Sequence, residues 1–383
     1  SDLGAANWIS PRQGATWSKY GGDFHASPTY EMTFEEGTEN LEIKITSLVE
    51  QWIRGEGGGP PEDPGKNNYG LAIYLTSSQE GFFSSSTGQD DVNTFELHNP
   101  NGAKESYYTK KFFSRGTEFF FKRPVIEARW DDSKKDNAGN FFLSSSLAPA
   151  EDNLNTLYLY NLVRGQLKNI PSVGANPILL SVYQTLGGDK ITLPVGGDVI
   201  GNDHINVTGG FVSTGIYSAS FAYTGSATTI YPVWHSGSTE FHTASAVTVN
   251  TLSSGDFNPN PKYVSKITNL KAIYDTDELA RFRLYVRQKD WNPTIYTKAT
   301  TSIETEIIED AYYKVFRVVD ELEVIPYGTG SLNHTRLSYD ASGSYFDLDM
   351  NLFEPEYAYA IKFVYHVNGA YHEQEELFKF RVE

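Results

Sequence analysis

Apolar and polar residues alternate along much of the chain, and this period of two is typical of half-buried strands. At the C-terminal end, Phe378, Phe380 and Val382 face one way, while the charged residues between them face the other. Residues 41–45 alternate in the same manner. We therefore expect a fold made mainly of β-strands, with the last residues of the chain inside a sheet.

Short β-rich runs continue through the rest of the chain, separated by Gly, Ser, Thr and Pro, a spacing that is typical of β-sandwiches. Before residue 133, further strands are expected at 69–76 and 124–130. Next come strands at 155–162, 178–183, 215–223, 230–234 and 246–249. The last group comprises 280–286, 312–319, 345–350, 357–365 and 377–382.

One short helix is predicted directly after the first strand. Thr46 or Ser47 can cap its start, and Gly55 ends it. Its apolar face would comprise Leu48, Val49, Trp52 and Ile53. The Gly- and Pro-rich residues 55–67 lack any period and predict a surface loop.

Two breaks in the pattern divide the 383 residues into three predicted domains. The charged loop at 131–140 gives the first boundary, and the Ser-, Asn- and Pro-rich residues 253–261 give the second. The domains are then 1–132, 133–258 and 259–383, and we expect the middle one to be an immunoglobulin-like sandwich.

Residues 353–363, FEPEYAYAIKF, have the spacing of a tyrosine corner. In that arrangement a Tyr hydroxyl at the entrance to a core strand bonds to backbone upstream. The last domain is therefore expected to be an immunoglobulin-like or fibronectin-like sandwich.

Several blocks near the start resemble a DNRLRE-type domain: WISPRQGATWSKYGGDF (8–24), ITSLVEQWI (45–53), NYGL (68–71), FSR (113–115) and RPVIE (123–127). The resemblance covers about residues 1–132. It implies a jelly-roll β-sandwich similar to carbohydrate-binding modules, of the kind found on bacterial and phage surface proteins. The loop at 55–67 and the region 81–106 depart from the family pattern.

The whole chain also resembles structural proteins of marine tailed phages, particularly cyanophages. One matching block runs from SYYTKKFF (106–113) to LAPAEDNLNTLYLY (147–160). The other runs from VIPYGTG (324–330) to SYDASGSYFDLDM (338–350). The resemblance implies a virion protein of the head decoration, the neck or collar, or the tail and fibre apparatus.

The composition of the chain limits the classes of molecule that it is expected to bind. The chain has 48 acidic and 31 basic residues, and its net charge of -17 repels phosphate backbones and anionic lipids. No apolar run approaches the length of a membrane span, and residues 1–10 lack the pattern of a signal peptide. The absent initiator Met predicts processing or trimming. With no cysteine, stability must come from packing.

Clusters of Asp and Asn side chains suggest a calcium site, because calcium binds several hard oxygen ligands. The candidates are Asp131, Asp132, Asp136, Asn137 and Asn140. A second group, Asp340, Asp347 and Asp349, includes two Asp on one face of a predicted strand, and an exposed polar face explains it more simply. Neither group has the spacing of an EF-hand loop, so no cofactor is expected, and calcium bound by the first group is the alternative.

The family resemblance offers Trp8, Trp17, Tyr20 and Tyr69 as aromatic platforms for a sugar ring. Core packing is the alternative for each, because Trp and Tyr are usually largely buried. The basic and aromatic stretch 107–129 could stack on single-stranded nucleic acid, but strands with aromatics inside explain it better in so acidic a chain.

Enzyme motifs are absent from the sequence: there is no Gly-x-Ser-x-Gly elbow, zinc-protease helix, P-loop or Rossmann pattern. The histidines, including His235, His242, His366 and His372, suit surface or hydrogen-bonded positions better than ligation. We expect a non-enzymatic virion protein that contacts other virion proteins as a multi-copy, symmetric assembly. Two alternatives remain open: a host-glycan adsorption protein and a polysaccharide depolymerase.

Overall fold

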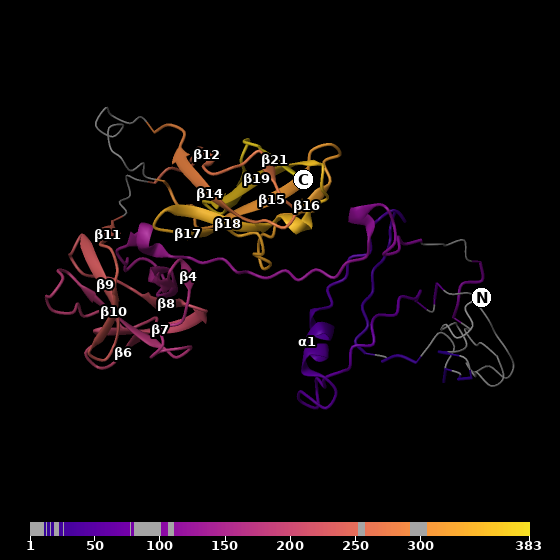
Figure 1. Ribbon diagram of the computed structural model, residues 1–383, viewed down its shortest axis with the longest axis horizontal. Coiled ribbons are helices and arrows are strands. Elements are labelled where there is room, and N and C mark those ends of the chain that lie inside the picture. Colours follow the sequence, from indigo (N-terminus) through magenta and orange to yellow (C-terminus); the bar gives the residue numbers. More distant parts are fainter. Residues whose placement is uncertain are drawn as a thin grey trace. The chain divides into compact units, whose positions relative to one another are not determined.

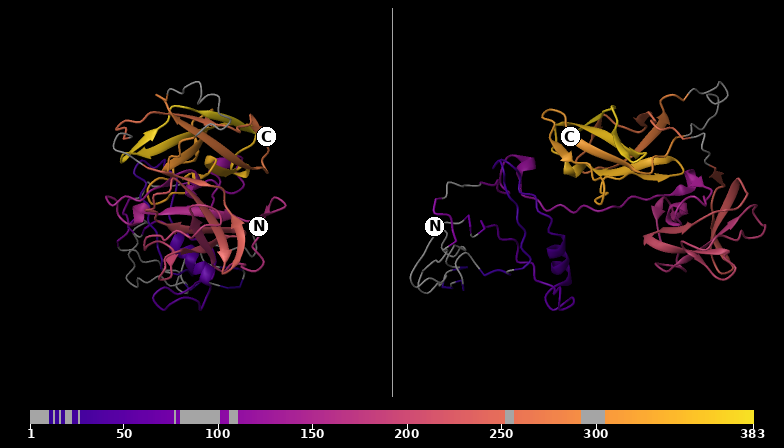
Figure 2. Two further views of the ribbon diagram at one scale, coloured as in Figure 1. Left: turned by 90° about the vertical axis from the view of Figure 1, so that its left-hand side faces the viewer. Right: turned by 180° about the vertical axis from the view of Figure 1, so that it is seen from behind.

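The computed structural model describes residues 11, 12, 14, 15, 17, 18, 23–25, 27–76, 78, 79, 101–105, 111–251, 257–291 and 305–383. Strands outnumber helices among these residues, as Figures 1 and 2 show. The contacts divide the chain into two compact units, Ser1–Phe113 and Ser114–Glu383, which are described separately. The all-β, multi-sandwich class expected from the sequence is confirmed.

The first unit contains the helix α1 (Thr46–Arg54), as predicted. Its N-cap is Ile45, whose apolar side chain cannot accept a hydrogen bond, so the predicted cap by Thr46 or Ser47 is wrong. The Ser47 hydroxyl lies 2.7 Å from the Tyr30 hydroxyl. Gly55 ends the helix with a φ of 70°, a left-handed value that favours glycine. Ile53 is 80 % exposed whereas Gln51 is buried, so the predicted apolar face is only partly covered.

The segments 41–45, 69–76 and 124–130 are not strands in the structure. Leu71 and Ile73 are 53 % and 68 % exposed, and Val125 is 70 % exposed. Alternation shows that a segment can cover a core, but a strand also needs a neighbouring strand to pair with. The described part of Ser1–Phe113 holds no strand, and the jelly roll there stays a prediction.

The nine strands of the middle sandwich are hydrogen-bonded into one continuous sheet that folds over on itself. Its strand order is β1-β11-β9-β5-β7-β8-β2. In addition, β10 pairs with β9, and β6 pairs with β7. Its strands are β1 (Phe141–Phe142), β2 (Asn155–Tyr160), β5 (Ile178–Tyr183), β6 (Val199–Ile200), β7 (Asn206–Ser213), β8 (Ile216–Phe221), β9 (Thr229–Ser236), β10 (Thr239–Thr243) and β11 (Val247–Asn250). A separate hairpin comprises β3 (Leu162–Val163) and β4 (Gln166–Leu167). Two 3₁₀ turns, η2 (Asn137–Gly139) and η3 (Glu151–Asn153), flank β1.

Strand β7 carries the sheet from one layer to the other. Its first half pairs with β5 and its second half with β8. The turn occurs at Gly209, where a Cβ would lie 2.6 Å from Cζ3 of Trp234 and 2.9 Å from the carbonyl oxygen of Ile178. Only glycine fits at so close an approach.

Asn155, which is fully buried, links β2 to β1 with its side chain. Its Nδ2 donates to the Phe142 carbonyl at 2.9 Å, and its Oδ1 accepts from the Phe142 amide at 2.9 Å. The amide group thereby copies the two hydrogen bonds of a sheet ladder and joins the two ends of the nine-stranded path.

The C-terminal sandwich has two sheets, β12-β14-β18-β17 and β13-β21-β19-β15-β16, with β20 paired to β19. This order matches the ABED and CFG sheets of immunoglobulin domains. The strands are β12 (Tyr263–Ile267), β13 (Ile273–Tyr274), β14 (Leu279–Gln288), β15 (Ala311–Arg317), β16 (Glu323–Ile325), β17 (Ser338–Asp340), β18 (Gly343–Asp349), β19 (Ala358–Val367), β20 (Ala370–Glu373) and β21 (Phe378–Val382). The 3₁₀ turns η1 (Phe120–Lys122) and η5 (Met350–Leu352) complete the elements.

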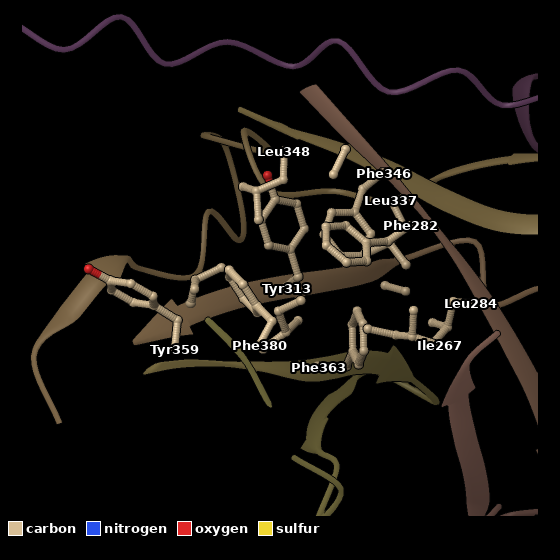
Figure 3. Packing of buried hydrophobic residues seen from close by; sticks show 14 of the residues in the cluster. Ile267, Phe282, Leu284, Tyr313, Leu337, Phe346, Leu348, Tyr359, Phe363 and Phe380 are labelled. Carbon is tan, nitrogen blue, oxygen red and sulfur yellow. The ribbon is translucent and has the colours of Figure 1, made fainter. Parts of the chain in front are cut away.

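Figure 3 shows the core between these two sheets. Phe346 of β18 stacks on Tyr313 of β15 with ring centroids 4.3 Å apart, and on Phe282 of β14 at 5.1 Å. The predicted alternation of β21 is confirmed, since Phe380 and Val382 are buried and the charged residues between and beyond them are exposed.

The tyrosine corner is confirmed. The hydroxyl of Tyr359, at the start of β19, donates to the carbonyl oxygen of Glu354 at 2.7 Å. Tyr359 is fully buried and its ring lies 4.7 Å from that of Phe353. In antibody domains a disulfide cysteine follows two residues later, and the buried Ile361 occupies that place here.

We expect Tyr359→Phe to lower the free energy of unfolding by about 1–3 kcal/mol, because the Glu354 carbonyl loses its donor while the ring stays packed. Chemical denaturation of the full chain measures the change. Tyr371→Phe, whose ring is 50 % exposed, is the matched control and should have little effect. An equal loss in the two variants contradicts a specific role for the corner.

Candidate functional site

The sequence candidates for glycan contact are not brought together by the described residues. Tyr69 is 82 % exposed, and its hydroxyl accepts a hydrogen bond from Nδ2 of Asn67 at 3.1 Å. Trp17 is half-buried. Trp8 and Tyr20 lie outside the described residues.

The charged segment 131–140 is hydrogen-bonded to both sandwiches of Ser114–Glu383, and we call it the junction. Its backbone runs along the edge strand β17, where the amide of Lys134 donates to Oγ of Ser338 at 3.0 Å. The carbonyl of Lys134 accepts from the amide of Tyr339 at 2.9 Å, and the amide of Asp136 donates to the carbonyl of Tyr339 at 3.1 Å. The segment thereby covers a sheet edge that would otherwise be unpaired.

Asp136 and Asn137 are each 5 % exposed, so two residues of the charged loop are buried. The physical reason is that both side chains satisfy backbone donors. Oδ1 of Asn137 accepts from the amide of Thr156 on β2 at 2.9 Å, and its Nδ2 donates to the carbonyl of Asn140 at 3.2 Å. Asp136 thus binds the C-terminal sandwich through its backbone, and Asn137 binds the middle sandwich through its side chain.

The Asp136 carboxyl is the most perturbed acid of the junction. Burial raises its pKa to about 7, and the negative charge of Asp340 acts in the same direction. Hydrogen bonds from the backbone of Ala138 and Tyr158 oppose the shift. The junction therefore holds a carboxyl that is protonated in mildly acidic solution and ionised in alkaline solution.

Tyrosines line both sides of the junction. Tyr158 and Tyr160 of β2 stack at 6.0 Å, and burial raises the pKa of both hydroxyls. Tyr345 of β18 is only 4 % exposed although it lies on the outer face of its sheet. Arg281 and Arg283 cover its ring at 4.6 and 4.7 Å.

Three of the five calcium candidates, Asp131, Asp136 and Asn137, use a side-chain oxygen to accept hydrogen bonds within the protein. Besides Asp136 and Asn137, Asp131 accepts from the amide and hydroxyl of Ser133. Nδ2 of Asn140 lies 3.4 Å from Oε1 of Glu309. Within the described residues, no group of three or more His, Cys, Asp or Glu side chains is arranged to hold a metal ion. The arrangement serves as a structural junction.

The second acidic group is also accounted for by local contacts. Asp347 pairs with Arg281 at 2.7 Å, and Asp340 pairs with Arg283 at 2.7 Å. Oδ1 of Asp349 caps the turn η5 by accepting from the amide of Asn351. Asp347 and Asp349 are both exposed on one face of β18, as expected from the sequence.

His235 has partners on both ring nitrogens, as the sequence interpretation expects. Nε2 lies 2.7 Å from Oγ of Ser181, and Nδ1 lies 3.1 Å from the carbonyl oxygen of Gly237. Burial lowers its pKa, and the positive charge of Lys190 acts in the same direction. His242 and His372 are exposed, and His366 stacks on Tyr371 at 4.6 Å.

Two pockets lie on the second unit. One, of about 30 Å³ beside the junction, has room for water alone and is lined in part by Asp132, His334 and Arg336. The other is an open cleft of about 950 Å³, lined in part by Glu354 and Glu383. Both carboxylates are engaged in ion pairs, Glu354 with Arg317 at 2.7 Å and Glu383 with Arg381 at 3.4 Å.

The basic and aromatic stretch behaves differently from the prediction of core strands. Residues 106–110 lie outside the described residues, and Phe112, Phe113 and Phe119 are each about half exposed, at 48, 46 and 52 %. Phe121 is the exception, because it packs against the C-terminal core under the guanidinium of Arg317 at 5.1 Å. Apolar content alone does not decide which aromatics reach a core.

Comparisons with known proteins give no family. No family model matches the chain, and no curated protein matches it. Among solved structures, a marsupial T cell receptor is 6 % identical and covers 64 % of this chain and 71 % of its own, with a TM-score of 0.19. The chicken CNTN1 FN1-FN3 domains are 9 % identical, covering 66 % and 68 %, with a TM-score of 0.19. Likeness at this level carries no functional argument.

No helix within the described ranges combines the length and the apolar character that a membrane crossing needs.

Proposed function

We propose that this chain is a non-enzymatic structural protein of a bacteriophage particle, whose sandwiches bind neighbouring virion proteins in multiple copies. The two sequence blocks shared with marine tailed-phage proteins support the proposal, and so does the DNRLRE-type resemblance of the first 132 residues. Its place on the particle is the head decoration, the neck or collar, or the tail and fibre apparatus.

The junction is the observation that carries the proposal. A segment with Asp136 and Asn137 buried is bonded to β17 on one side and to β2 on the other, and joins the two sandwiches through hydrogen bonds of 2.9–3.1 Å. A pair of sandwiches joined in this way transmits load through these hydrogen bonds and presents outer sheet faces to neighbours. Such faces suit the repeated contacts of a symmetric assembly.

Purified particles test the proposal directly. Mass spectrometry of particles should find the chain at a constant ratio to the major capsid protein, and a reconstruction should show which proteins surround it. Particles that lack the chain altogether would refute a structural role.

A second function, host-glycan binding for adsorption, is favoured by one observation. Tyr69 has a ring that is 82 % exposed, in a segment that the sequence assigns to a carbohydrate-binding-like domain. Exposed aromatic rings offer the apolar face on which sugar rings stack.

If glycan binding is the function, Tyr69→Ala should reduce the signal of the full chain on a host-glycan array by at least about tenfold, as expected for the loss of roughly 1.4 kcal/mol. Tyr371→Ala, which removes an exposed ring from the C-terminal sandwich, is the control. Equal binding by the two variants argues against Tyr69 as the platform.

A further inference from the structure

The outer face of β12 and β14 carries a run of basic residues in a strongly acidic protein. Ile267, Phe282, Leu284 and Val286 point into the core. The alternate positions therefore point outward. The ladder is defined as the four basic residues on this outer face together with the two lysines that flank the strands, Lys262 directly before β12 and Lys289 directly after β14; the four are Lys266, Arg281, Arg283 and Arg287.

The register brings these cations together. Val264 pairs with Arg287, and Lys266 pairs with Tyr285, so Lys266 and Arg287 are diagonal neighbours on the same face. The amide of Lys289 donates to the carbonyl of Lys262 at 2.7 Å, which places these two lysines opposite each other. Neither 262–266 nor 281–289 contains an acidic residue.

Only one end of the ladder is neutralised. Arg281 and Arg283 are held by Asp347 and Asp340. The other four cations, Lys262, Lys266, Arg287 and Lys289, form no ion pair with an acid of the described residues. Like charges placed opposite one another on a sheet destabilise it, so this end of the ladder has a cost in the isolated chain.

Protection of the sheet edge explains part of the pattern. Lysines on an edge strand discourage unwanted strand pairing, and β12 is an edge strand. That reason covers Lys262 and Lys266. It does not cover Arg287, because β14 lies inside the sheet between β12 and β18, and it does not cover Lys289, which directly follows β14.

We propose that the ladder is a contact surface for the acidic surface of a second copy of this chain. Outside the ladder, each copy carries 25 basic and 48 acidic residues, so acidic residues that attract the ladder outnumber basic ones on the rest of the chain. A contact between a basic face on one copy and an acidic face on the next is heterologous, and it builds rings or extended arrays. The inference deepens the proposed structural role and rests on it.

Sedimentation velocity of the purified full chain tests the contact at about 0.05 M and about 0.5 M salt, since screening lengths shorten over this range. The wild type should associate at low salt and dissociate at high salt. The double variant Lys266→Glu/Arg287→Glu should weaken association by at least about tenfold, because it places like charges across the contact.

The control is Lys44→Glu/Lys379→Glu, which makes the same change of net charge at exposed lysines that do not belong to the ladder. It should associate like the wild type, and thermal melts of both variants confirm that they fold. A wild type that is monomeric at both salts overturns the proposal. So does equal weakening in the two variants, or binding of the ladder to a sulfated polysaccharide while the chain stays monomeric.

A failure of the self-contact can be distinguished from a failure of the proposed structural role in the particle. Presence of the chain in particles is measured independently, so a monomeric chain that is still a particle component overturns the self-contact alone.

Discussion

Phe346→Ala should lower the free energy of unfolding of the C-terminal sandwich by about 3–5 kcal/mol. The side chain is 4 % exposed and lies between Phe282 and Tyr313, with Phe363 edge-on at 5.9 Å. Removing the ring loses its burial and leaves a cavity that two opposed sheets cannot close (Figure 3). Urea denaturation of the full chain, followed by tyrosine fluorescence, gives the value.

Leu279→Ala is the control for this variant. Leu279 starts the neighbouring strand β14 but is 71 % exposed, so its removal should change stability by less than about 0.5 kcal/mol. A loss below about 1 kcal/mol for Phe346→Ala would mean that the aromatic stack is not the centre of this core.

Relative to Asp136→Asn, the wild type should lose up to roughly 4 kcal/mol of stability as the pH rises from about 4 to about 7. The carboxyl is buried at the junction, and its pKa is raised from 3.8 to about 7. Each unit of difference between the folded and unfolded pKa corresponds to about 1.4 kcal/mol.

The direction follows from counting protons. Below the unfolded pKa of 3.8, both states are protonated and burial costs little. Between 3.8 and about 7 the unfolded chain ionises first, so it binds fewer protons and stability falls with pH. Above about pH 7 the folded state carries the full free-energy cost of burying an ionised carboxylate. Asparagine mimics the protonated carboxyl and keeps an oxygen for the Ala138 amide, so the variant avoids the penalty.

Thermal melts at pH 4.5, 6 and 8 measure the difference between the two proteins. Asp132→Asn removes an exposed carboxylate from the same segment and takes no buried charge away, so it should track the wild type. If Asp136→Asn also tracks the wild type across the range, the carboxyl is not buried as an unpaired acid in solution.

The sequence predicts the two sandwiches of the second unit well. Strand β5 matches the expected 178–183, and β2, β8, β9 and β11 coincide closely with their predicted ranges. These strands are recognisable because each has one face in the core. Strand β7 was not predicted, because Gly209 and Gly210 interrupt its apolar pattern where Trp234 needs the space.

The N-terminal segments show the limit of the same reasoning. Residues 69–76 alternate as cleanly as β21 does, yet they are exposed and unpaired. Periodicity records which side chains could share a face. It contains nothing about whether a neighbouring strand is available to pair.

The junction could not be predicted for a different reason. Asp136 and Asn137 occur in a charged run that looks like any solvated loop, and their burial depends on Tyr339 and Thr156, which are distant in sequence. A buried polar group is stable only when its partners are in place, and sequence spacing does not show those partners. The capping position of Asp136 before η2 was the one local signal.

The bond between Lys134 and Ser338 joins residues 204 positions apart. During synthesis, strand β17 must therefore be completed before Lys134, in the segment that precedes β1, can form this hydrogen bond. Until then, Lys134 and the Asp136 backbone lack their partners on β17. A nascent chain stopped short of Ser338 should therefore leave this segment open to proteases, so the order of synthesis sets when the two sandwiches are joined.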